Sequence, residues 1–251
     1  METISAIVIT RNEETQIGRC LESVRWVDEI VIVDSHSSDR TREIARTYTP
    51  HVYEEDWRGY GLQKASALAK ATGDWVLSVD ADEEVTPALR EEILRAVRNG
   101  QSRHAGYLIP RRFYFLGQPL VHGGLYPKYY LRLFRRDRGT FEDRPVHEGV
   151  RVTGSVGRLR GDLLHYSYRD LQQYWEKAGR YAMLYVEMRR NNPISLWRFL
   201  GIPLKFLYRY VFRLGFLDGR YGLYWHGLEA LQTFFRYAAL YEAQRSNRGV
   251  R

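Results

Sequence analysis

Two aspartates one residue apart, Asp80 and Asp82, are the clearest chemical signal in the sequence. They follow the apolar run 75–79, which has the length and composition of a buried strand. If that strand continues through Asp82, both carboxylates point to one face, because side chains alternate along a strand. Paired carboxylates offer the hard oxygen ligands that Mg²⁺ or Mn²⁺ prefers, with positions left open for phosphate oxygens. A solvated acidic turn is the alternative reading of the same residues.

The first hundred residues are expected to build a sheet that carries these aspartates at its edge. Apolar runs at 4–10, 30–33 and 75–79 alternate with helical patterns. Strands that are apolar throughout and separated by helices indicate a parallel sheet covered on both faces, which is the α/β class. Ligands of such sheets bind outside the carboxyl ends of the strands. Chemistry is therefore expected at the polar residues that follow the three runs, at 10–13, 34–37 and 80–83.

The rest of the chain changes character twice. Residues 105–165 contain short strand-like pieces and turns without helical periodicity. From residue 171 the pattern is helical and rich in aromatic residues. We therefore expect an α/β domain over residues 1–170 and a helical extension over residues 171–251.

The net charge of +8 is unevenly distributed along the chain. Residues 1–100 carry 12 Lys and Arg against 19 Asp and Glu, whereas residues 186–251 carry 11 against 4. A uniformly basic nucleic-acid binder does not usually begin with an acidic third, so no nucleic acid is expected as a partner. A single cysteine excludes an intramolecular disulfide, and no signal-peptide pattern opens the sequence. The expected location is the cytoplasm.

Three motifs carry a resemblance to a known family. They read IVITRNEE at residues 7–14, DEIVIVDSHSSDRT at 28–41 and GDWVLSVDADE at 73–83. In this order and spacing they resemble the family 2 glycosyltransferases of the GT-A fold, over roughly residues 3–170. Within that family the chain looks most like the bacterial lipopolysaccharide core β-glucosyltransferases, and WRGYG at 57–61 and GFLDG at 215–219 strengthen the likeness. The resemblance implies a GT-A (Rossmann-like) catalytic domain with a helical, basic and aromatic C-terminal extension.

The resemblance also implies a donor site for a nucleotide-sugar such as a UDP-sugar. Asp34 is expected to bond the base, and Lys64 is the best candidate for a cation on the diphosphate, although a solvated helix lysine is nearly as good a reading. Asp80 is expected to face the ribose or the metal. The residues expected to line the nucleotide pocket are Thr10, Asn12, Glu13 and Asp34.

By the same resemblance, the metal ligands are expected to be Asp80, Asp82 and His165. The metal would act as a Lewis acid on the leaving nucleoside diphosphate. An inverting transfer also needs one general base that takes the proton from the acceptor hydroxyl. We expect Glu148 to be this base, with Asp143 as the second candidate. The structural alternative pairs either carboxylate with Arg144 or Arg151.

The basic tail contains a segment, 196–216, that is long enough to cross a bilayer but carries four cations. At about 2.5–3.5 kcal/mol for each Lys or Arg at a helix centre, spanning is not expected. Lys205, Arg209 and Arg213 lie at i, i+4 and i+8, which predicts one basic helical face. Such a helix would lie on an anionic membrane surface. The alternative is a helix that packs on the catalytic domain with a solvated basic edge.

The leading hypothesis is a metal-dependent inverting glycosyltransferase at the inner face of the cell membrane. It would move a sugar, glucose by resemblance, from a UDP-sugar to a lipid-linked glycan such as the lipopolysaccharide inner core. The alternatives are transfer to another cell-envelope acceptor and a non-catalytic binder of anionic surfaces or nucleic acid that uses the basic tail. A phosphate-backbone binder would gain nothing from Asp34, Asp80 and Asp82 in one crevice. A nucleotidyltransferase would ordinarily show a glycine-rich loop after the first strand, where this chain has residues 10–13 without glycine.

Overall fold

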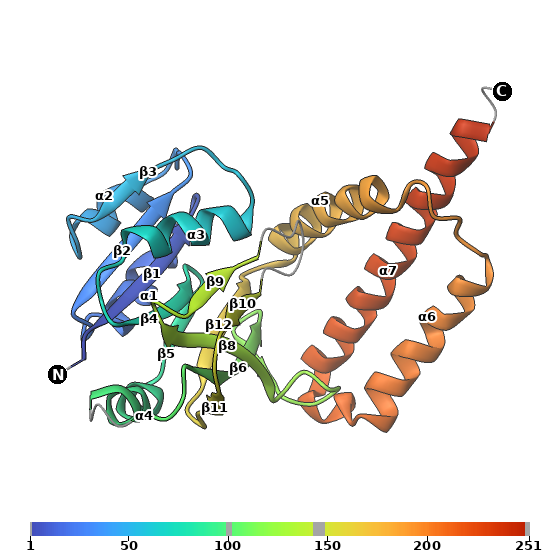
Figure 1. Cartoon of the computed structure of the whole chain (residues 1–251). Coiled ribbons are helices and arrows are strands. Elements are labelled where there is room, and N and C mark those ends of the chain that lie inside the picture. Colours follow the sequence, from blue (N-terminus) through green and yellow to red (C-terminus); the bar gives the residue numbers. More distant parts are fainter. Residues whose placement is uncertain (1, 99–101, 143–148, 249–251) are drawn as a thin grey trace. The chain divides into compact units, whose positions relative to one another are not determined.

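The structure is a computed structural model of the 251-residue chain, and it describes residues 2–98, 102–142 and 149–248. It divides into two compact units, residues 1–111 with 128–165, and residues 112–127 with 166–251. The first unit is mixed α/β and the second is mainly helical, so the predicted fold class is confirmed (Figure 1). The functional boundary at residue 170 stays a prediction.

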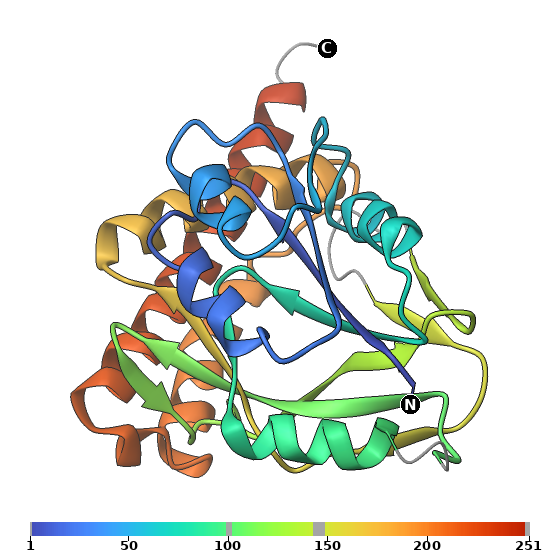
Figure 2. The ribbon, with the colours of Figure 1, turned by 90° about the vertical axis from the view of Figure 1, so that its left-hand side faces the viewer.

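The first unit begins with alternating strands and helices and ends with strands. Figure 2 faces this part of the chain. Its elements are β1 Ile4–Thr10, α1 Ile17–Ser23, β2 Glu29–Asp34, α2 Thr41–Arg46, β3 Val52–Glu54, α3 Tyr60–Lys70, β4 Trp75–Asp80, β5 Glu83–Val85, α4 Pro87–Arg98, β6 Gly106–Phe115, β8 Lys128–Arg135, β9 Gly139–Phe141, β10 Val150–Val152, β11 Val156–Arg158 and β12 Leu163–Tyr168, of which β6 and β12 continue into the second unit.

The main sheet has the strand order β3-β2-β1-β4-β8-β6-β12-β5. The strands β3, β2, β1 and β4 are parallel, and β8 joins β4 in the antiparallel sense. In the parallel part, Thr10 lies opposite Asp34 and Ile9 lies opposite Asp80. The carboxyl ends of β1, β2 and β4 therefore finish at one edge of the sheet, as the sequence predicts.

Strand β1 is buried at every position because helices cover both faces of the sheet. Ile4, Ala6 and Val8 belong to the apolar cluster that includes residues of α1, α2 and α4. Ile7 and Ile9 belong to the cluster on the opposite face, which includes residues of α3. This alternation is the period of two that a strand imposes on its side chains. It confirms the prediction that a uniformly apolar strand is covered on both faces.

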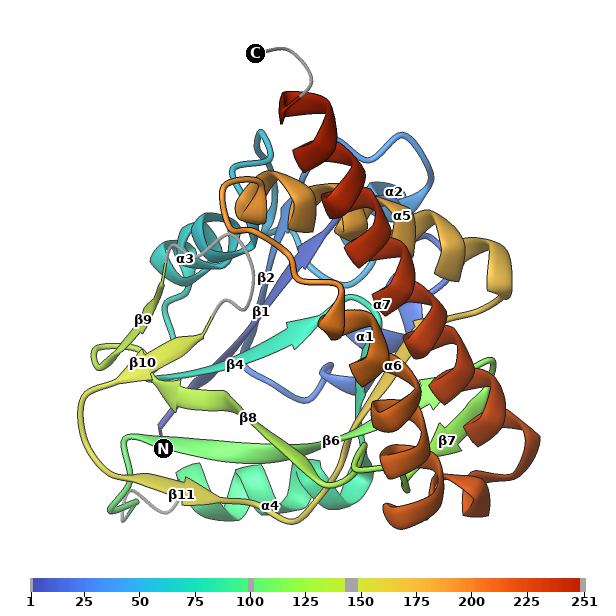
Figure 3. The same cartoon turned by 90° about the vertical axis from the view of Figure 1, so that its right-hand side faces the viewer.

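The second unit is built around a long C-terminal helix. Its elements are β7 Gln118–Leu120, α5 Leu171–Arg189, α6 Trp197–Leu207, the π-helical turn η1 Tyr208–Phe212, the 3-10 turn η2 Gly215–Asp218 and α7 Gly219–Arg248. Helix α7 lies beside both α5 and α6, and α6 and α7 form a helical hairpin (Figure 3). The Asp170 side chain caps α5 by accepting a hydrogen bond from the Gln173 backbone N–H at 2.7 Å.

The GFLDG segment ties this helical hairpin to the loop that follows β7. The Asp218 carboxylate, 4% exposed, accepts hydrogen bonds from the backbone N–H groups of Val121 at 3.1 Å and His122 at 3.0 Å. It also lies 2.6 Å from His122 Nδ1. On α7, the buried His226 ring lies directly against two glycines. A Cβ atom added at Gly123 would lie 2.0 Å from His226 Nε2, and a Cβ atom added at Gly215 would lie 2.6 Å from it. Four contacts thus hold the loop to the start of α7.

The predicted continuous helix over 196–216 is wrong in its second half. Helix α6 ends at Leu207, a π-helical turn follows, and Leu214 adopts a left-handed backbone with φ 60°. The chain must turn here because Gly215 lies against His226 and α7 begins at Gly219. In the described part of the chain, no helix combines the length and apolar character needed to cross a bilayer.

Candidate active site

The loops after β1 and β2 are joined by the side chains of Asp34 and Asn12. Asp34 is fully buried and accepts hydrogen bonds from the Ser37 backbone N–H at 2.8 Å and the Ser37 hydroxyl at 2.5 Å. Asn12 has a left-handed backbone with φ 55°, and its backbone N–H donates to the Ser37 hydroxyl at 2.8 Å. Its side-chain oxygen accepts from the Ser38 N–H. The two residues therefore fix the loop geometry at this edge, and their contacts with a nucleotide stay predictions.

Thr10 and Glu13 stand at the same edge. The Thr10 carbonyl accepts a hydrogen bond from the Ser35 N–H at 2.9 Å. The Thr10 hydroxyl is among the buried polar atoms that have no hydrogen-bond partner in the described structure. Leaving such a group unsatisfied costs about 1–3 kcal/mol, so this position favours a polar ligand. The Glu13 backbone N–H donates a hydrogen bond to the Thr41 hydroxyl. Its carbonyl accepts hydrogen bonds from the backbone N–H groups of Gln16 and Ile17, at the start of α1.

Asp80, at the end of β4, lies between two buried cations. Lys64 of α3 is 6% exposed, and its Nζ lies 2.8 Å from Asp80 Oδ1. Arg132 of β8 is 8% exposed and donates from Nη2 to Asp80 Oδ2 at 2.6 Å. Burial alone would raise the pKa of Asp80, but the charges of Arg132 and then Lys64 hold that pKa well below its ordinary value. Asp80 is therefore an ionised carboxylate in a fixed position.

Glu83 completes this charged cluster. Its side chain is fully buried, accepts from Arg132 Nη2 at 2.7 Å on one oxygen and accepts from the Asp80 backbone N–H at 2.9 Å on the other. Arg111 Nη1 lies 3.5 Å from the same carboxylate. Burial raises the pKa of Glu83, and the charge of Asp80 adds to this although Arg132 opposes it. We refer to Lys64, Asp80, Glu83 and Arg132 as the ion cluster.

Arg132 is not among the residues predicted for the site, and Glu83 is included only as part of the polar segment 80–83. A signal for Arg132 was present, because in the strand 129–134 it alternates onto the same face as Phe134, which is buried. A cation on a buried face of a strand needs a carboxylate partner. For Glu83 the signal was weaker, since only the pairing of β5 with β12 makes it a buried strand residue.

Asp82 meets His165 and not Asp80. Strand β4 ends at Asp80 and a turn follows, so the condition that the strand continue through Asp82 is not met. Asp82 Oδ2 lies 3.4 Å from His165 Nε2, where His165 of β12 is the register partner of Glu83. The two predicted metal ligands Asp82 and His165 are thus brought together, whereas both oxygens of Asp80 are engaged by cations.

The pair Asp82 and His165 fits a divalent cation that substrate oxygens complete. Neighbouring ligands of an octahedral Mg²⁺ at about 2.1 Å lie about 3 Å apart, close to the separation of this oxygen and nitrogen. Among the described residues, no group of three or more His, Cys, Asp or Glu side chains could hold a metal ion. Mg²⁺ and Mn²⁺ prefer oxygen ligands, and Mg²⁺ commonly uses one or two carboxylates together with waters and substrate phosphates, so the carboxylate of Asp82 is the stronger candidate ligand of the two.

The two candidate bases, Asp143 and Glu148, lie outside the described residues. Strands β9 and β10 flank them and pair antiparallel, with Phe141 opposite Val150. Arg151, one of the predicted partners of these carboxylates, forms an ion pair with Glu142. The choice between Asp143 and Glu148 stays a prediction.

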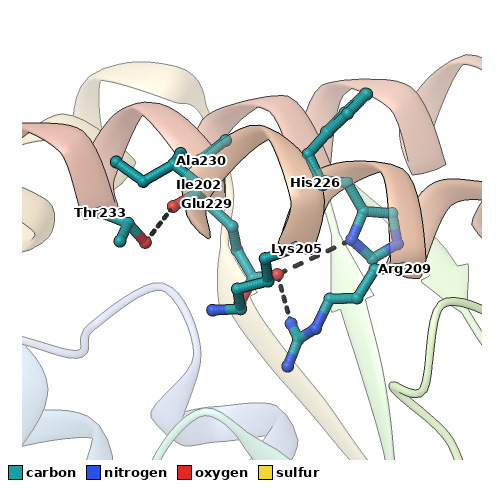
Figure 4. A pocket seen from close by; sticks show the side chains of 8 residues that line it. Ile202, Lys205, Arg209, His226, Glu229, Ala230 and Thr233 are labelled. Carbon is teal, nitrogen blue, oxygen red and sulfur yellow. Dashed lines mark hydrogen bonds and ion pairs between the residues drawn. The ribbon is translucent and has the colours of Figure 1, made fainter. Parts of the chain in front are cut away.

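A second cluster of charged groups lies between α6 and α7 in the helical unit (Figure 4). Glu229 lies 2.5 Å from Arg209 Nη1 and 3.7 Å from His226 Nδ1. Burial alone would raise the pKa of Glu229, but His226, Arg209 and Lys205 lower it to about 2. The hollow here has room for about one water molecule. It therefore suits no nucleotide, and the cluster is a structural feature of the hairpin.

This cluster corrects the predicted basic face of residues 205–213. Arg209 and Lys205 line the hollow next to Glu229, and burial lowers the pKa of Lys205. Arg213 follows the π-helical turn, and its guanidinium lies near Gly124. The three cations therefore do not form one row on a continuous helix.

The comparisons with known proteins agree with the geometry of the first unit. The model of the family Glycosyl transferase family 2 matches residues 5–152, more than half of the chain. The chain belongs to this family. It is 31% identical to the lipopolysaccharide core biosynthesis glycosyltransferase LpsC of Rhizobium meliloti (strain 1021), over 94% of this chain and 93% of that protein. The predicted family resemblance is confirmed.

Two further similarities extend over nearly the whole chain. An uncharacterized glycosyltransferase of Rickettsia typhi (strain ATCC VR-144 / Wilmington) is 31% identical over 100% of this chain and 90% of that protein. Among solved structures, S. aureus TarS 1-349 in complex with UDP aligns with a TM-score of 0.49 and 17% identity, over 98% of this chain and 92% of that one.

The ion cluster predicts a large effect of Arg132 on stability. Replacing Arg132 with methionine leaves Asp80 and Glu83 without their shared cation, which should lower the free energy of unfolding by about 3 kcal/mol. Urea unfolding followed by circular dichroism measures this change. The matched control is Arg138→Met at an exposed position, which should change the free energy by less than about 0.5 kcal/mol. Equal stability of the Arg132→Met variant and the unchanged protein would contradict the described role.

The second cluster predicts an acid-dependent contribution from Glu229. Its pKa is lowered from 4.5 to about 2, so the contribution is present above the ordinary pKa and is lost as the pH falls toward 2. A shift of this size corresponds to about 3 kcal/mol. Glu229→Gln should therefore destabilise the protein at neutral pH, and the difference should shrink in acid. Urea unfolding over a pH series measures it, with the exposed Glu187→Gln as control. A difference that is constant with pH would refute the assignment.

Proposed function

We propose that the protein is a metal-dependent inverting glycosyltransferase that transfers a hexose from a UDP-sugar to a lipid-linked glycan. The observation that carries the proposal is that the ion cluster and the pair of Asp82 with His165 both lie at the carboxyl end of β4, at one edge of the parallel strands. Ligands of such sheets bind at this edge. Membership of glycosyl transferase family 2 supports the reaction class.

Lys64 and Arg132 are the proposed source of positive charge for the donor diphosphate. Both side chains are buried and held by Asp80, so their positions are set before any substrate arrives. Fixed charges in a site of low water content stabilise developing negative charge without reorganising. In this proposal they bind and orient the donor, and Thr10 offers its free hydroxyl to the same ligand.

Asp82 and His165 are the proposed protein ligands of a Mg²⁺ or Mn²⁺ ion. When bound, the ion would supply a Lewis acid that neutralises charge on the leaving nucleoside diphosphate. Asp80, which the sequence analysis also assigned to the metal, acts in this proposal through its ion pairs with Lys64 and Arg132. Glu148 is the proposed base that takes the proton from the acceptor hydroxyl, and Asp143 is the second candidate.

The acceptor is proposed to be a membrane glycolipid such as the lipopolysaccharide inner core, reached from the cytoplasmic side. The name of the Rhizobium meliloti relative supports this class of acceptor. Glucose is the proposed sugar, and another cell-envelope glycan is the alternative acceptor. A non-catalytic binder of anionic surfaces would have no use for the converging carboxylates of the first unit, so the site favours an enzyme.

The metal assignment predicts that Asp82→Asn lowers kcat/KM by at least about 100-fold. Loss of a residue that only hydrogen-bonds to a metal ligand commonly costs about 10- to 100-fold, and loss of a ligand itself should cost no less. The assay is release of UDP from a panel of UDP-sugars, with Mn²⁺, with Mg²⁺ and with a chelator. Asp137→Asn, at an exposed position of the same unit, is the control and should keep full activity. Full activity of the unchanged protein in the presence of the chelator would contradict the proposed metal dependence.

The base assignment predicts that Glu148→Gln lowers kcat by about 10²- to 10⁴-fold. The affinity for UDP, measured by calorimetry, should stay the same, because the base contacts the acceptor hydroxyl and not the nucleotide. Asp143→Asn is the matched variant and should retain most of the rate. If Asp143→Asn is inactive and Glu148→Gln is not, the base is Asp143.

A further inference from the structure

The outward side of α6 and η1 carries a row of exposed apolar side chains. They recur at the three- and four-residue spacing of one helical face. The members that are more than half exposed, with their exposed fractions, are Leu196 65%, Trp197 78%, Leu200 57%, Leu204 67%, Tyr208 54% and Phe212 72%. We call these six residues the α6 apolar face. Scattered apolar residues on a surface are ordinary, but a contiguous row of this kind marks an interaction site.

The other side of α6 is already covered by α7. Phe199 packs with Phe234 and Tyr237, at ring-centroid distances of 5.5 and 5.7 Å. Ile202 and Phe206 line the hollow next to Glu229 (Figure 4). The helix therefore has two apolar sides, of which the α7 contact uses one. The α6 apolar face is not part of the core of the helical unit.

The charges of the segment that carries this face are of one sign. Residues 188–217 contain no Asp or Glu and six cations, which are Arg189, Arg190, Arg198, Lys205, Arg209 and Arg213. Lys205 and Arg209 face Glu229, whereas Arg198 and Arg213 are exposed. An apolar row bordered by cations is complementary to a surface that is apolar inside and negative outside.

A second copy of the chain would fit this face poorly. Two α6 apolar faces in contact would bring two sets of cations together without a carboxylate from either segment 188–217. Like charges at an interface cost free energy. An anionic bilayer offers the opposite sign, and Trp197 and Tyr208 are residue types that favour the lipid headgroup level. The eleven residues of α6 span about 16 Å, too short to cross a bilayer, so the helix would lie in its plane.

We propose that the α6 apolar face inserts into the headgroup region of an anionic membrane and that Arg198 contacts lipid phosphates at its border. The proposal deepens the membrane location of the proposed function and replaces the basic row of residues 205–213 with an apolar one. Its test measures vesicle binding, which requires neither donor nor acceptor. It therefore fails or succeeds separately from the transferase assignment.

The test uses a fluorophore on the face itself. Cys20 is the single cysteine of the chain and is fully buried, so a cysteine introduced by Leu204→Cys can be labelled selectively in the folded protein with an environment-sensitive dye. Leu231→Cys is the matched control, because Leu231 is 55% exposed on α7 and by its helical spacing points away from Glu229, Ala230 and Thr233. Vesicles contain phosphatidylcholine alone or phosphatidylcholine and phosphatidylglycerol in equal amounts.

We expect the emission of the dye at residue 204 to shift to shorter wavelength with the mixed vesicles, and the dye at residue 231 to stay unchanged. In the unlabelled protein, Leu200→Gln with Leu204→Gln should lower the vesicle partition coefficient at least about tenfold, since burial of one leucine side chain alone is worth about that factor. Leu231→Gln should not lower it. Arg198→Gln should weaken binding to the mixed vesicles about fivefold and leave binding to phosphatidylcholine unchanged.

Two results would overturn the proposal. One is an unchanged emission of the dye at residue 204 when the protein binds the vesicles. That result would mean that a different surface of the protein contacts the lipid. The other is a shift at residue 204 that grows with protein concentration in the absence of vesicles, together with a dimer mass in light scattering. That outcome would assign the α6 apolar face to a second copy of the chain.

Discussion

The candidate site depends on one electrostatic constraint, the placement of the half-buried carboxylate of Asp80 and the buried carboxylate of Glu83 around the guanidinium of Arg132. Neither carboxylate would be stable there as an anion without a cation, because burial penalises an isolated charge. Arg132 is contributed by the antiparallel strand β8, while Asp80 ends the parallel strand β4. The ion cluster therefore couples the two halves of the sheet at the point where the donor is proposed to bind. Lys64 adds a second cation from the helix side.

Much of the first unit could be predicted from the sequence because its signals are local. The apolar run of β1 and the stripe of Ile17, Cys20 and Leu21 each report a buried surface through their own spacing. The partners of Asp80 could not be found in this way, since Lys64 and Arg132 come from distant segments. The meeting of Asp82 with His165 required the family resemblance, because no spacing in the sequence relates residues 82 and 165.

The tail shows where periodicity alone misleads. A repeat of i, i+4 and i+8 identifies one face only while the helix continues, and α6 ends before the third cation. The sequence contained a contrary signal in Gly215 and Asp218, which belong to a turn and not to a helix. The cations at 205 and 209 were also assigned to the wrong side, because Glu229 attracts them from a neighbouring helix. The apolar residues of the same segment were the better guide to its surface.

The contacts of Asp218 bear on how sequences of this kind are sorted. The carboxylate holds the backbone of Val121 and His122, and a short distance along α7 the His226 ring occupies the space above Gly123. In this chain the GFLDG segment therefore has a structural role, because it holds the helical hairpin to the loop that follows β7. The same segment in another sequence would therefore indicate a similar helical hairpin and loop. It would not indicate which sugar that protein transfers.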